Sequence, residues 1–310
     1  MKHILTLSDK NYVTYGLCLY DSISRHSSNF TLHYLAMDKE TEDILSRLKL
    51  ENIKVYSMDD IENNPQFAEL KLNNESRPID ISDGQSDFHW ALASFFSAHL
   101  LNSGLPHVLY VDSDILFYRD IETVFEAVGD KSIGLITHKH IRLHKVATNP
   151  GYYNVGIIYF KNDKVGSECL NFWKDCCVYP DNEYAPVYGV CGDQKYLELF
   201  DELFGEENIE VLCHKVGNGA PWNFTMLEFK DNNRIVWKDP EGLVLSPGES
   251  MEQDLVFNHF SHFTPDYDDE SFNFDRGGEW GPYLPTHPGV KETYIDYFVR
   301  LLDTRERYEL

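Results

Sequence analysis

Residues 107–118 constrain the fold more than any other part of the chain. Val108 to Val111 form an apolar run rich in β-branched and aromatic residues, which is typical of a strand buried on both faces. Asp112 and Asp114 follow at once, and two carboxylates two residues apart on an extended backbone point the same way. Ligands of open α/β sheets bind beyond the carboxyl ends of strands, so this pair is placed to hold a divalent cation.

The alternative interpretation of Asp112 and Asp114 is a pair of solvated acids in a turn that caps the strand. A second apolar run, Ile115 to Tyr118, follows the two acids. A solvated turn is not normally flanked by apolar segments on both sides. The sequence therefore favours a cation site whose remaining coordination positions take a substrate diphosphate.

Strand-like and helix-like segments alternate along most of the chain, which predicts an α/β fold with a mostly parallel sheet flanked by helices. No internal repeat or low-complexity linker divides the chain. We expect one catalytic domain over residues 1–265 and a C-terminal extension over residues 266–310 with a closing helix. Strands are expected at 3–7, 31–37, 53–56, 108–111, 132–137, 155–160 and 255–257. Helices are expected at 11–26, 39–48, 88–101, 121–128, 163–178, from 192 onward and at 290–302. Residues 57–86 are expected to form irregular and partly helical structure over the mouth of the site, and residues 266–286 an extended tail.

The net charge of −24 excludes a nucleic-acid surface, which would need a basic stripe. An anionic substrate would be repelled as well, unless a bound cation screens it. The most basic segment is His138 to Lys145. It is either a solvated face or a loop that meets phosphate or an anionic acceptor.

The six cysteines form no Cys-x-x-Cys pair and have no histidine-rich zinc spacing, so free and mostly buried thiols are expected. The N-terminal apolar run is too short for a signal peptide, and no stretch approaches the ~18 apolar residues that a membrane helix needs. A cytoplasmic location without a transmembrane segment is therefore expected.

Two histidines after the expected last strand are candidates for a third metal ligand. His259 and His262 both lie next to phenylalanines, and a lone histidine in that setting is more often a satisfied core residue. The accumulation of polar groups at predicted strand ends favours the metal role. Two aspartate oxygens and one histidine nitrogen suit Mn²⁺ better than Ca²⁺.

Five short motifs resemble, in this order, those of a known enzyme family. They are Asp9-Lys10-Asn11-Tyr12 after Ser8, Leu109-Tyr110-Val111-Asp112-Ser113-Asp114, Tyr153-Asn154-Val155-Gly156, Asp193-Gln194, and His259-Phe260. Over residues 3–263 the chain resembles the metal-dependent nucleotide-diphospho-sugar transferases of the GT-A fold, in particular the retaining group that contains glycogenin and bacterial lipopolysaccharide galactosyltransferases. The resemblance implies a GT-A, Rossmann-like sheet and a hexosyltransferase. Its donor is expected to be a UDP-sugar, and its acceptor a hydroxyl of a saccharide, a lipid-linked molecule or a protein.

The same resemblance implies roles for individual residues. Asp112, Asp114 and His259 would bind Mn²⁺ or Mg²⁺, which would stabilise the leaving diphosphate as a Lewis acid. No dedicated base is evident, which fits a retaining route in which the leaving phosphate takes the acceptor proton. The turn-rich segment 217–224 is of the kind that lines pockets. Nucleotide contacts are assigned to Leu7, Ser8, Asp9, Asn11, Tyr12, Asp112 and Ser113, catalytic positions to Asp193, Gln194 and Asn154, and substrate contacts to Asn218, Trp222, Asn223 and His262.

Two departures from the family pattern concern the donor contacts. The family's Arg or Lys on the helix before the Asp-x-Asp strand is absent from residues 90–96, and its Lys-Pro-Trp after the metal histidine is replaced by residues 263–266. Lys215, His262 and the segment 138–145 are the candidates to supply these contacts instead.

Two other classes of function compete with a glycosyltransferase. A sugar-phosphate nucleotidyltransferase would need a Gly-rich loop with Arg or Lys after the first strand, and residues 7–15 contain no Gly or Arg. A catalytically inactive nucleotide-sugar-binding protein would not need to retain both Asp112 and Asp114. Both observations favour the glycosyltransferase.

Overall fold

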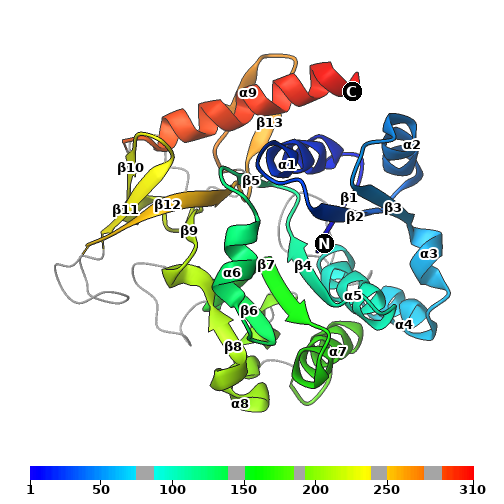
Figure 1. The fold of residues 1–310 in the computed structure, drawn as a ribbon. Coiled ribbons are helices and arrows are strands. Elements are labelled where there is room, and N and C mark those ends of the chain that lie inside the picture. Colours follow the sequence, from blue (N-terminus) through cyan, green and yellow to red (C-terminus); the bar gives the residue numbers. More distant parts are fainter. Residues whose placement is uncertain (75–86, 139–150, 185–192, 239–249, 276–287) are drawn as a thin grey trace.

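A central sheet of seven strands, in the order β3-β2-β1-β4-β7-β6-β8, positions the functional groups (Figure 1). The structure, a computed structural model, describes residues 1–74, 87–138, 151–184, 193–238, 250–275 and 288–310. Within the sheet, β7 is antiparallel to β4 and β6, and all other neighbours are parallel, which confirms the mostly parallel sheet. The strands are β1 (Lys2–Ser8), β2 (Phe30–Ala36), β3 (Ile53–Ser57), β4 (His107–Val111), β6 (Ile133–Thr137), β7 (Tyr153–Lys161) and β8 (Ile209–Val211).

Helices cover both faces of this sheet. The central strand β4 shows why, because Val108 and Tyr110 belong to one buried core while Leu109 and Val111 belong to the core on the other face. One face is covered by α1 (Val13–His26), α2 (Lys39–Leu48) and α6 (Glu122–Val128), and the other by α3 (Met58–Glu62), α4 (Pro65–Asn74), α5 (Asp87–Asn102) and α7 (Lys164–Val178).

Helix ends lie where the sequence supplies capping groups. Asp38 accepts a hydrogen bond of 2.8 Å from the backbone of Thr41 at the start of α2. Asp163 does the same for Gly166 in α7, at 2.9 Å. Asp120 accepts from the backbone of Glu122, but α6 begins one residue later than the sequence predicted.

A second sheet carries the C-terminal part of the chain to the centre of the molecule. Its order is β10-β11-β12-β5, with β9 beside β12. Because β12 runs antiparallel to β5, His259 at the end of β12 pairs with Ile115, one residue after Asp114. These strands are β5 (Ile115–Phe117), β9 (Gly217–Gly219), β10 (Leu227–Lys230), β11 (Arg234–Lys238) and β12 (Ser250–His259).

The C-terminal segment packs on the rest of the chain through a third, aromatic-rich core. Its elements are a hairpin of β13 (Thr264–Asp266) and β14 (Ser271–Asn273), and the helix α9 (Val290–Tyr308), which lies alongside α1 (Figure 1). The ring of Tyr297 in α9 stacks on Phe260, with centroids 3.8 Å apart and planes at 8°. The division of the chain at residue 265 stays a prediction.

Several sequence expectations differ from the observed elements. Residues 58–74, expected to be irregular and only partly helical, form the helices α3 and α4, because Ile61, Phe67 and Leu70 give them a buried face. The strand expected at 255–257 begins at Ser250, where it pairs with β11, and α9 runs to Tyr308 instead of 302. The helix expected from residue 192 onward is a 3₁₀ segment, η1 (Gln194–Leu199), followed by the short helix α8 (Phe200–Phe204). Three further 3₁₀ turns in the described ranges are η2 (Glu206–Asn208), η3 (Leu212–His214) and η4 (Phe224–Met226).

The expected extended tail at 266–286 is partly a hairpin, since β14 pairs with β13 and Phe272 packs against the third core. Residues 276–287 lie outside the described part of the chain. Five cysteines are free and buried, as predicted, and Cys191 is not among the described residues. Within the described ranges, no helix combines the length and the apolar character that crossing a membrane requires.

Candidate functional site

The two carboxylates of the Asp-x-Asp motif lie in a tight turn between β4 and β5. The backbone N–H of Asp112 donates to the carbonyl of Gly156 on β7, at 3.0 Å, so the turn begins as a continuation of the central sheet. Ile115 N–H then donates to the carbonyl of Asp112 at 3.2 Å and starts β5. The turn therefore lies where the central sheet meets the second sheet.

His259 completes a group of three possible metal ligands with these two aspartates. Its Nε2 atom lies 3.1 Å from Oδ1 of Asp114 and 3.6 Å from Oδ2 of Asp112. One ligand atom from each residue lies within 4.8 Å of the others. The side chain of Asp112 is 29% exposed, against 7% for His259, so the group is open on the aspartate side. Two carboxylate oxygens and one imidazole nitrogen are a donor set that Mn²⁺ and Mg²⁺ accept, with positions left for substrate oxygens.

The electrostatics of this group favour a bound cation. Burial raises the pKa of Asp112, and the neighbouring Asp114 adds to that effect, although His259 opposes it. Burial alone would lower the pKa of His259, but the charges of Asp114 and Asp112, together with the hydrogen bond to Asp114, outweigh burial and raise that pKa. A divalent cation would take the place of the proton on His259 and relieve the repulsion between the carboxylates.

Two residues outside the ligand set hold it in place. The hydroxyl of Tyr110 donates to Oδ1 of Asp112 at 2.8 Å. Gly156 lies directly against His259, because a Cβ atom added to Gly156 would meet Nδ1 of His259 at 2.7 Å. The same Cβ would meet Oδ1 of Asn154 at 2.6 Å, so any side chain at 156 would push both groups away.

The predicted catalytic residues are connected to one another at the start of β7. Asn154 Nδ2 donates to Oε1 of Gln194 at 3.0 Å, and Val155 N–H donates to the same oxygen at 3.1 Å. Oδ1 of Asn154 accepts from Gly156 N–H at 2.9 Å. The structure thus brings Asn154 and Gln194 together beside the residue that contacts His259.

Asp193 precedes Gln194 at the start of η1 and is buried. Its backbone carbonyl accepts from the indole N–H of Trp173 at 2.9 Å, which anchors the segment to α7. Burial is the main cause that raises the pKa of Tyr110, and the charges of Asp112 and Asp193 add to it.

The predicted nucleotide-binding residues lie at the carboxyl end of β1, next to β4. Asp9 Oδ1 accepts from the backbone of Asn11 at 3.0 Å and of Tyr12 at 3.2 Å, which closes the turn before α1. The hydroxyls of Ser8 and Tyr34 share a buried hydrogen bond of 2.7 Å, so the Ser8 side chain is directed into the core. Leu7 is partly buried against the core, and Ser113 is buried in the Asp-x-Asp turn between β4 and β5.

The predicted substrate-binding residues lie on or near β9 and the end of β12. Asn218 is buried on β9, opposite Phe257 of β12. Trp222 places its ring edge-on against His259, with centroids 5.2 Å apart. Asn223 is fully buried and closes its own turn by accepting from Ala220 N–H at 2.9 Å. His262 contacts Asp275 at 3.2 Å.

His138 belongs to this cluster, although the sequence indicated only a basic segment there. Its Nε2 lies 3.4 Å from Asn154 Nδ2, and its ring lies against Trp222 with centroids 5.0 Å apart. Its carbonyl accepts from Asn223 Nδ2 at 3.2 Å. The signal that could have identified it is its position, one residue beyond the end of β6.

The basic segment and Lys215 do not add a described cation to the site. Residues 139–145 lie outside the described part of the chain, so the prediction for this segment stays untested. Lys215 pairs with Glu210 at 2.9 Å and donates to the carbonyl of Ala127 at 3.2 Å. Its side chain therefore contacts α6 and β8, and its role as a replacement donor contact stays a prediction.

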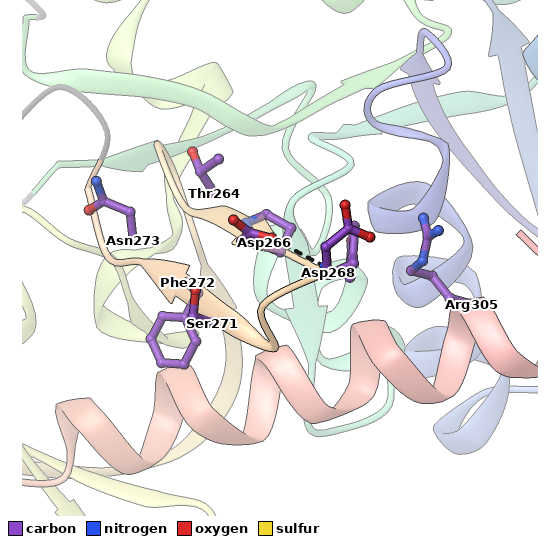
Figure 2. Close-up of a pocket in the computed structure, with 9 residues that line it drawn as sticks. Thr264, Asp266, Asp268, Ser271, Phe272, Asn273 and Arg305 are labelled. Atoms are coloured by element: carbon purple, nitrogen blue, oxygen red, sulfur yellow. Dashed lines mark hydrogen bonds between the residues drawn. The ribbon is translucent and has the colours of Figure 1, made fainter.

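A cavity of about 650 Å³ lies elsewhere, between the β13–β14 hairpin and α9 (Figure 2). Thr264, Asp266, Ser271 and Asn273 of the hairpin line it, and Arg305 of α9 closes one side. None of the three possible metal ligands is among its lining residues.

Comparison with known proteins agrees with this geometry. Residues 3–171 match the family described as glycosyl transferase family 8. The chain is 30% identical over 268 residues to the uncharacterized protein YfnF of Bacillus subtilis (strain 168), a match that covers 83% of this chain and 80% of that protein. The galactosyltransferase LgtC, solved with donor and acceptor sugar analogs, has the same fold with a TM-score of 0.56 and 16% identity, over 96% of this chain and 95% of LgtC.

A second LgtC structure, of an active-site mutant, matches with the same TM-score of 0.56 and 16% identity, over 97% of this chain and 95% of LgtC. At this level of identity the likeness establishes the GT-A fold. The family match covers more than half of the chain. The chain belongs to glycosyl transferase family 8 and is a nucleotide-sugar glycosyltransferase of the GT-A fold.

Proposed function

We propose that the protein transfers a hexosyl group from a UDP-sugar to a hydroxyl of its acceptor, with Mn²⁺ or Mg²⁺ as cofactor and with retention of anomeric configuration. The acceptor is a saccharide, a lipid-linked molecule or a protein, and the reaction is expected in the cytoplasm. The observation that carries the proposal is the convergence of Asp112, Asp114 and His259, whose ligand atoms lie within 4.8 Å of one another.

The cation would be held by Asp112, Asp114 and His259, and when bound it supplies Lewis-acid stabilisation of the departing diphosphate. Tyr110 keeps Asp112 oriented through its hydrogen bond of 2.8 Å. Gly156 leaves room for His259 beside β7. These contacts fix the ligands before substrate arrives, so that little reorganisation is needed on binding.

The donor would lie across the carboxyl ends of β1 and β4. The turn closed by Asp9 presents Asn11 and Tyr12 at this edge of the sheet, where a nucleoside fits next to the metal-bound diphosphate. UDP is favoured because this turn matches the uridine-binding pattern of the resembled family.

Gln194 and Asn154 would face the transferred sugar. Gln194 accepts two hydrogen bonds from β7, at 3.0 and 3.1 Å, which fixes its side chain in one orientation. The LgtC active-site mutant in the comparison carries a glutamine-to-glutamate substitution. We assign the corresponding position to Gln194. Asp193 precedes it as the second polar group of the pair.

Retention is favoured because the resembled family is retaining and no dedicated base is evident, so that the leaving phosphate would take the acceptor proton. An inverting enzyme would need a carboxylate poised as base at the acceptor hydroxyl. Asp112 and Asp114 would be used by the cation, and Asp193 is buried at the start of η1. Family membership also disfavours the sugar-phosphate nucleotidyltransferase alternative.

A screen of nucleotide-sugar hydrolysis, with and without Mn²⁺, tests the proposal. We expect nucleoside diphosphate release from one or more UDP-sugars only when the cation is present. Asp114→Asn should remove this release, while Asp43→Asn, a change of an exposed acid on α2, should leave it intact. Equal release in metal-free protein would overturn the metal mechanism.

A further inference from the structure

Two side chains of η1 hold the start of β7. Gln194 and Glu198 lie four positions apart in this 3₁₀ segment. Oε1 of Glu198 accepts from the backbone N–H of Tyr152 at 2.6 Å and from that of Tyr153 at 3.4 Å. Oε1 of Gln194 accepts from the two residues that follow in the strand. One short segment therefore supplies hydrogen-bond acceptors to four consecutive residues of the chain.

These hydrogen bonds lie where the pairing of β7 with β6 is interrupted. Ile136 on β6 pairs with Asn154. Its neighbour Leu135 pairs with Ile158, so residues 155–157 are left out of the pairing with β6. Backbone groups at such an irregularity need other partners, and irregularities of this kind are frequent beside active sites. The conformation of the strand around Asn154 therefore depends on side-chain contacts as well as on strand pairing.

A glycine makes room for the carboxylate of Glu198. Gly151 has φ of +90°, a conformation that residues with a Cβ atom rarely adopt. A Cβ atom added there would lie 2.9 Å from Oε1 of Glu198. The glycine thus allows the carboxylate to reach the two backbone N–H groups that follow it.

Other contacts hold the same segments together without Glu198. The indole N–H of Trp173 donates to the carbonyl of Asp193 at 2.9 Å, directly before η1. The hydroxyl of Tyr153 donates to the two oxygens of Asp201 at 3.1 and 3.2 Å. Removal of the Glu198 carboxylate should therefore leave the fold in place and loosen only the local contact between η1 and β7.

We propose that Glu198 is a positioning residue that keeps Gln194 and Asn154 in place for the transfer of the sugar; this rests on the proposed function above. Glu198 belongs to the same segment as Gln194 and binds the two residues that precede Asn154. It thus adds a second link beside the hydrogen bond between Asn154 and Gln194. Such a link matters because a displacement of about 1 Å at the reacting groups can cost about a hundredfold in rate.

Three variants separate the hydrogen bonds of Glu198 from its charge. Glu198→Ala removes both bonds. Glu198→Gln removes the charge but keeps a side-chain oxygen, and a single oxygen accepts both bonds in the wild type. Glu202→Ala is the matched control, because Glu202 is an exposed acid four residues further along, in α8. The kcat and KM for hydrolysis of UDP-glucose and UDP-galactose with Mn²⁺ and the affinity for UDP by calorimetry are measured for each protein.

We expect Glu198→Ala to lower kcat about tenfold or more, because Gln194 and Asn154 are less precisely placed. Its affinity for UDP, which carries no sugar, should equal that of the wild type, since Glu198 is not among the possible metal ligands. Glu198→Gln and Glu202→Ala should both keep the wild-type kcat. An unchanged kcat in Glu198→Ala, an equal loss in Glu198→Gln, or a parallel loss of UDP affinity overturns the inference alone.

Two further measurements keep the outcomes separate. If Glu198→Ala melts well below the wild type, Glu198→Met, which keeps the length of the side chain without its oxygens, replaces it with the same expectation. Gln194→Ala should lower kcat at least as much as Glu198→Ala, and an unchanged kcat there would overturn the assignment of Gln194 on which the inference rests. Failure of the wild type to release UDP from any UDP-sugar overturns the proposed function, and the inference with it.

Discussion

Nε2 of His259 lies 3.1 Å from Oδ1 of Asp114, although the two residues are 145 positions apart in the chain. The contact forms because β12 pairs with β5 directly after the Asp-x-Asp turn. Without a cation the contact between His259 and Asp114 is an ion pair or a hydrogen bond. With the proposed cation bound, both side chains would be its ligands.

Asp114→Asn should lower kcat by more than about a hundredfold, since loss even of a group that only orients a ligand costs up to about that factor. The fold should remain, because the amide is isosteric with the carboxylate. Steady-state kinetics across a Mn²⁺ titration, together with circular dichroism, check both statements. Activity of the wild type that survives complete chelation by EDTA would contradict metal dependence.

Gly156→Ala should weaken cation binding by about tenfold or more. The added Cβ would lie within 2.8 Å of His259 ring atoms, so the imidazole must move. The overpacking should also cost about 1–3 kcal/mol of stability. Gly134→Ala on β6 is the control, because its Cβ would meet Val128 at 2.8 Å, in the core rather than at the site. If both variants bind Mn²⁺ alike, Gly156 does not position His259.

UDP should raise the melting temperature in Mn²⁺ more than GDP or ADP does. At a hundredfold excess over Kd the shift should be on the order of 5 °C. Asp9→Ala should reduce the shift, because the carboxylate that accepts from Asn11 and Tyr12 is lost. Differential scanning fluorimetry measures all of these, and a shift with GDP as large as that with UDP would reject the uridine assignment.

The product should keep the α configuration when the donor is α-linked. We expect Asp193→Asn to reduce transfer without changing that outcome, because Asp193 is not assigned as a base. The anomeric proton coupling in the NMR spectrum of the product decides the question. A β-linked product would show that a carboxylate acts as general base in an inverting reaction.

Acidification should destabilise the protein through a cluster of three histidines, His3, His33 and His107. His3 and His107 lie at the amino ends of β1 and β4, away from the candidate site at the carboxyl ends, and His33 lies on the neighbouring strand β2. Burial, with the charges of His3 and Lys54, lowers the pKa of His33 to about 4, and burial with His3 also lowers that of His107 to about 4. The unfolded chain therefore binds more protons than the folded one between the ordinary pKa of about 6.5 and about 4.

The stability that the neutral forms of His33 and His107 contribute is complete above their unfolded-state pKa of about 6.5. It is lost as the pH falls through their folded-state pKa of about 4. The melting temperature should fall between pH 7 and pH 4.5, and less steeply in His33→Gln than in the wild type. Parallel pH profiles for the two proteins would show that His33 is not a source of the acid sensitivity.

Local sequence patterns predicted the central sheet and its helices because each element there carries its own periodicity. The apolar run at 108–111 and the helix predicted at 39–48 are examples, because the structure has β4 at His107–Val111 and α2 at Lys39–Leu48. The convergence of Asp112, Asp114 and His259 was anticipated from strand ends and family resemblance, and the geometry agrees with it.

Pairings between distant segments had no such local signal. The lengthened β12 alternates polar and apolar residues weakly at 250–254, and its start is set by pairing with β11. Asp275 was assigned to a tail because nothing near it in the sequence indicates His262 as its partner. His138 was read as part of a basic segment, although its position after β6 directs it to Asn154. Such contacts depend on tertiary register, which periodicity does not encode.

The stack of Phe260 on Tyr297 makes the support of the Asp-x-Asp turn depend on a helix that is synthesised late. Phe260 N–H donates to the carbonyl of Asp114 at 3.0 Å, so the residue beneath the Tyr297 ring is bonded to the Asp-x-Asp turn. A nascent chain folds from its N-terminus while the ribosome is still adding residues. The central sheet can therefore form before α9 is synthesised, whereas the turn at 112–114 gains the support of the Phe260–Tyr297 stack only afterwards.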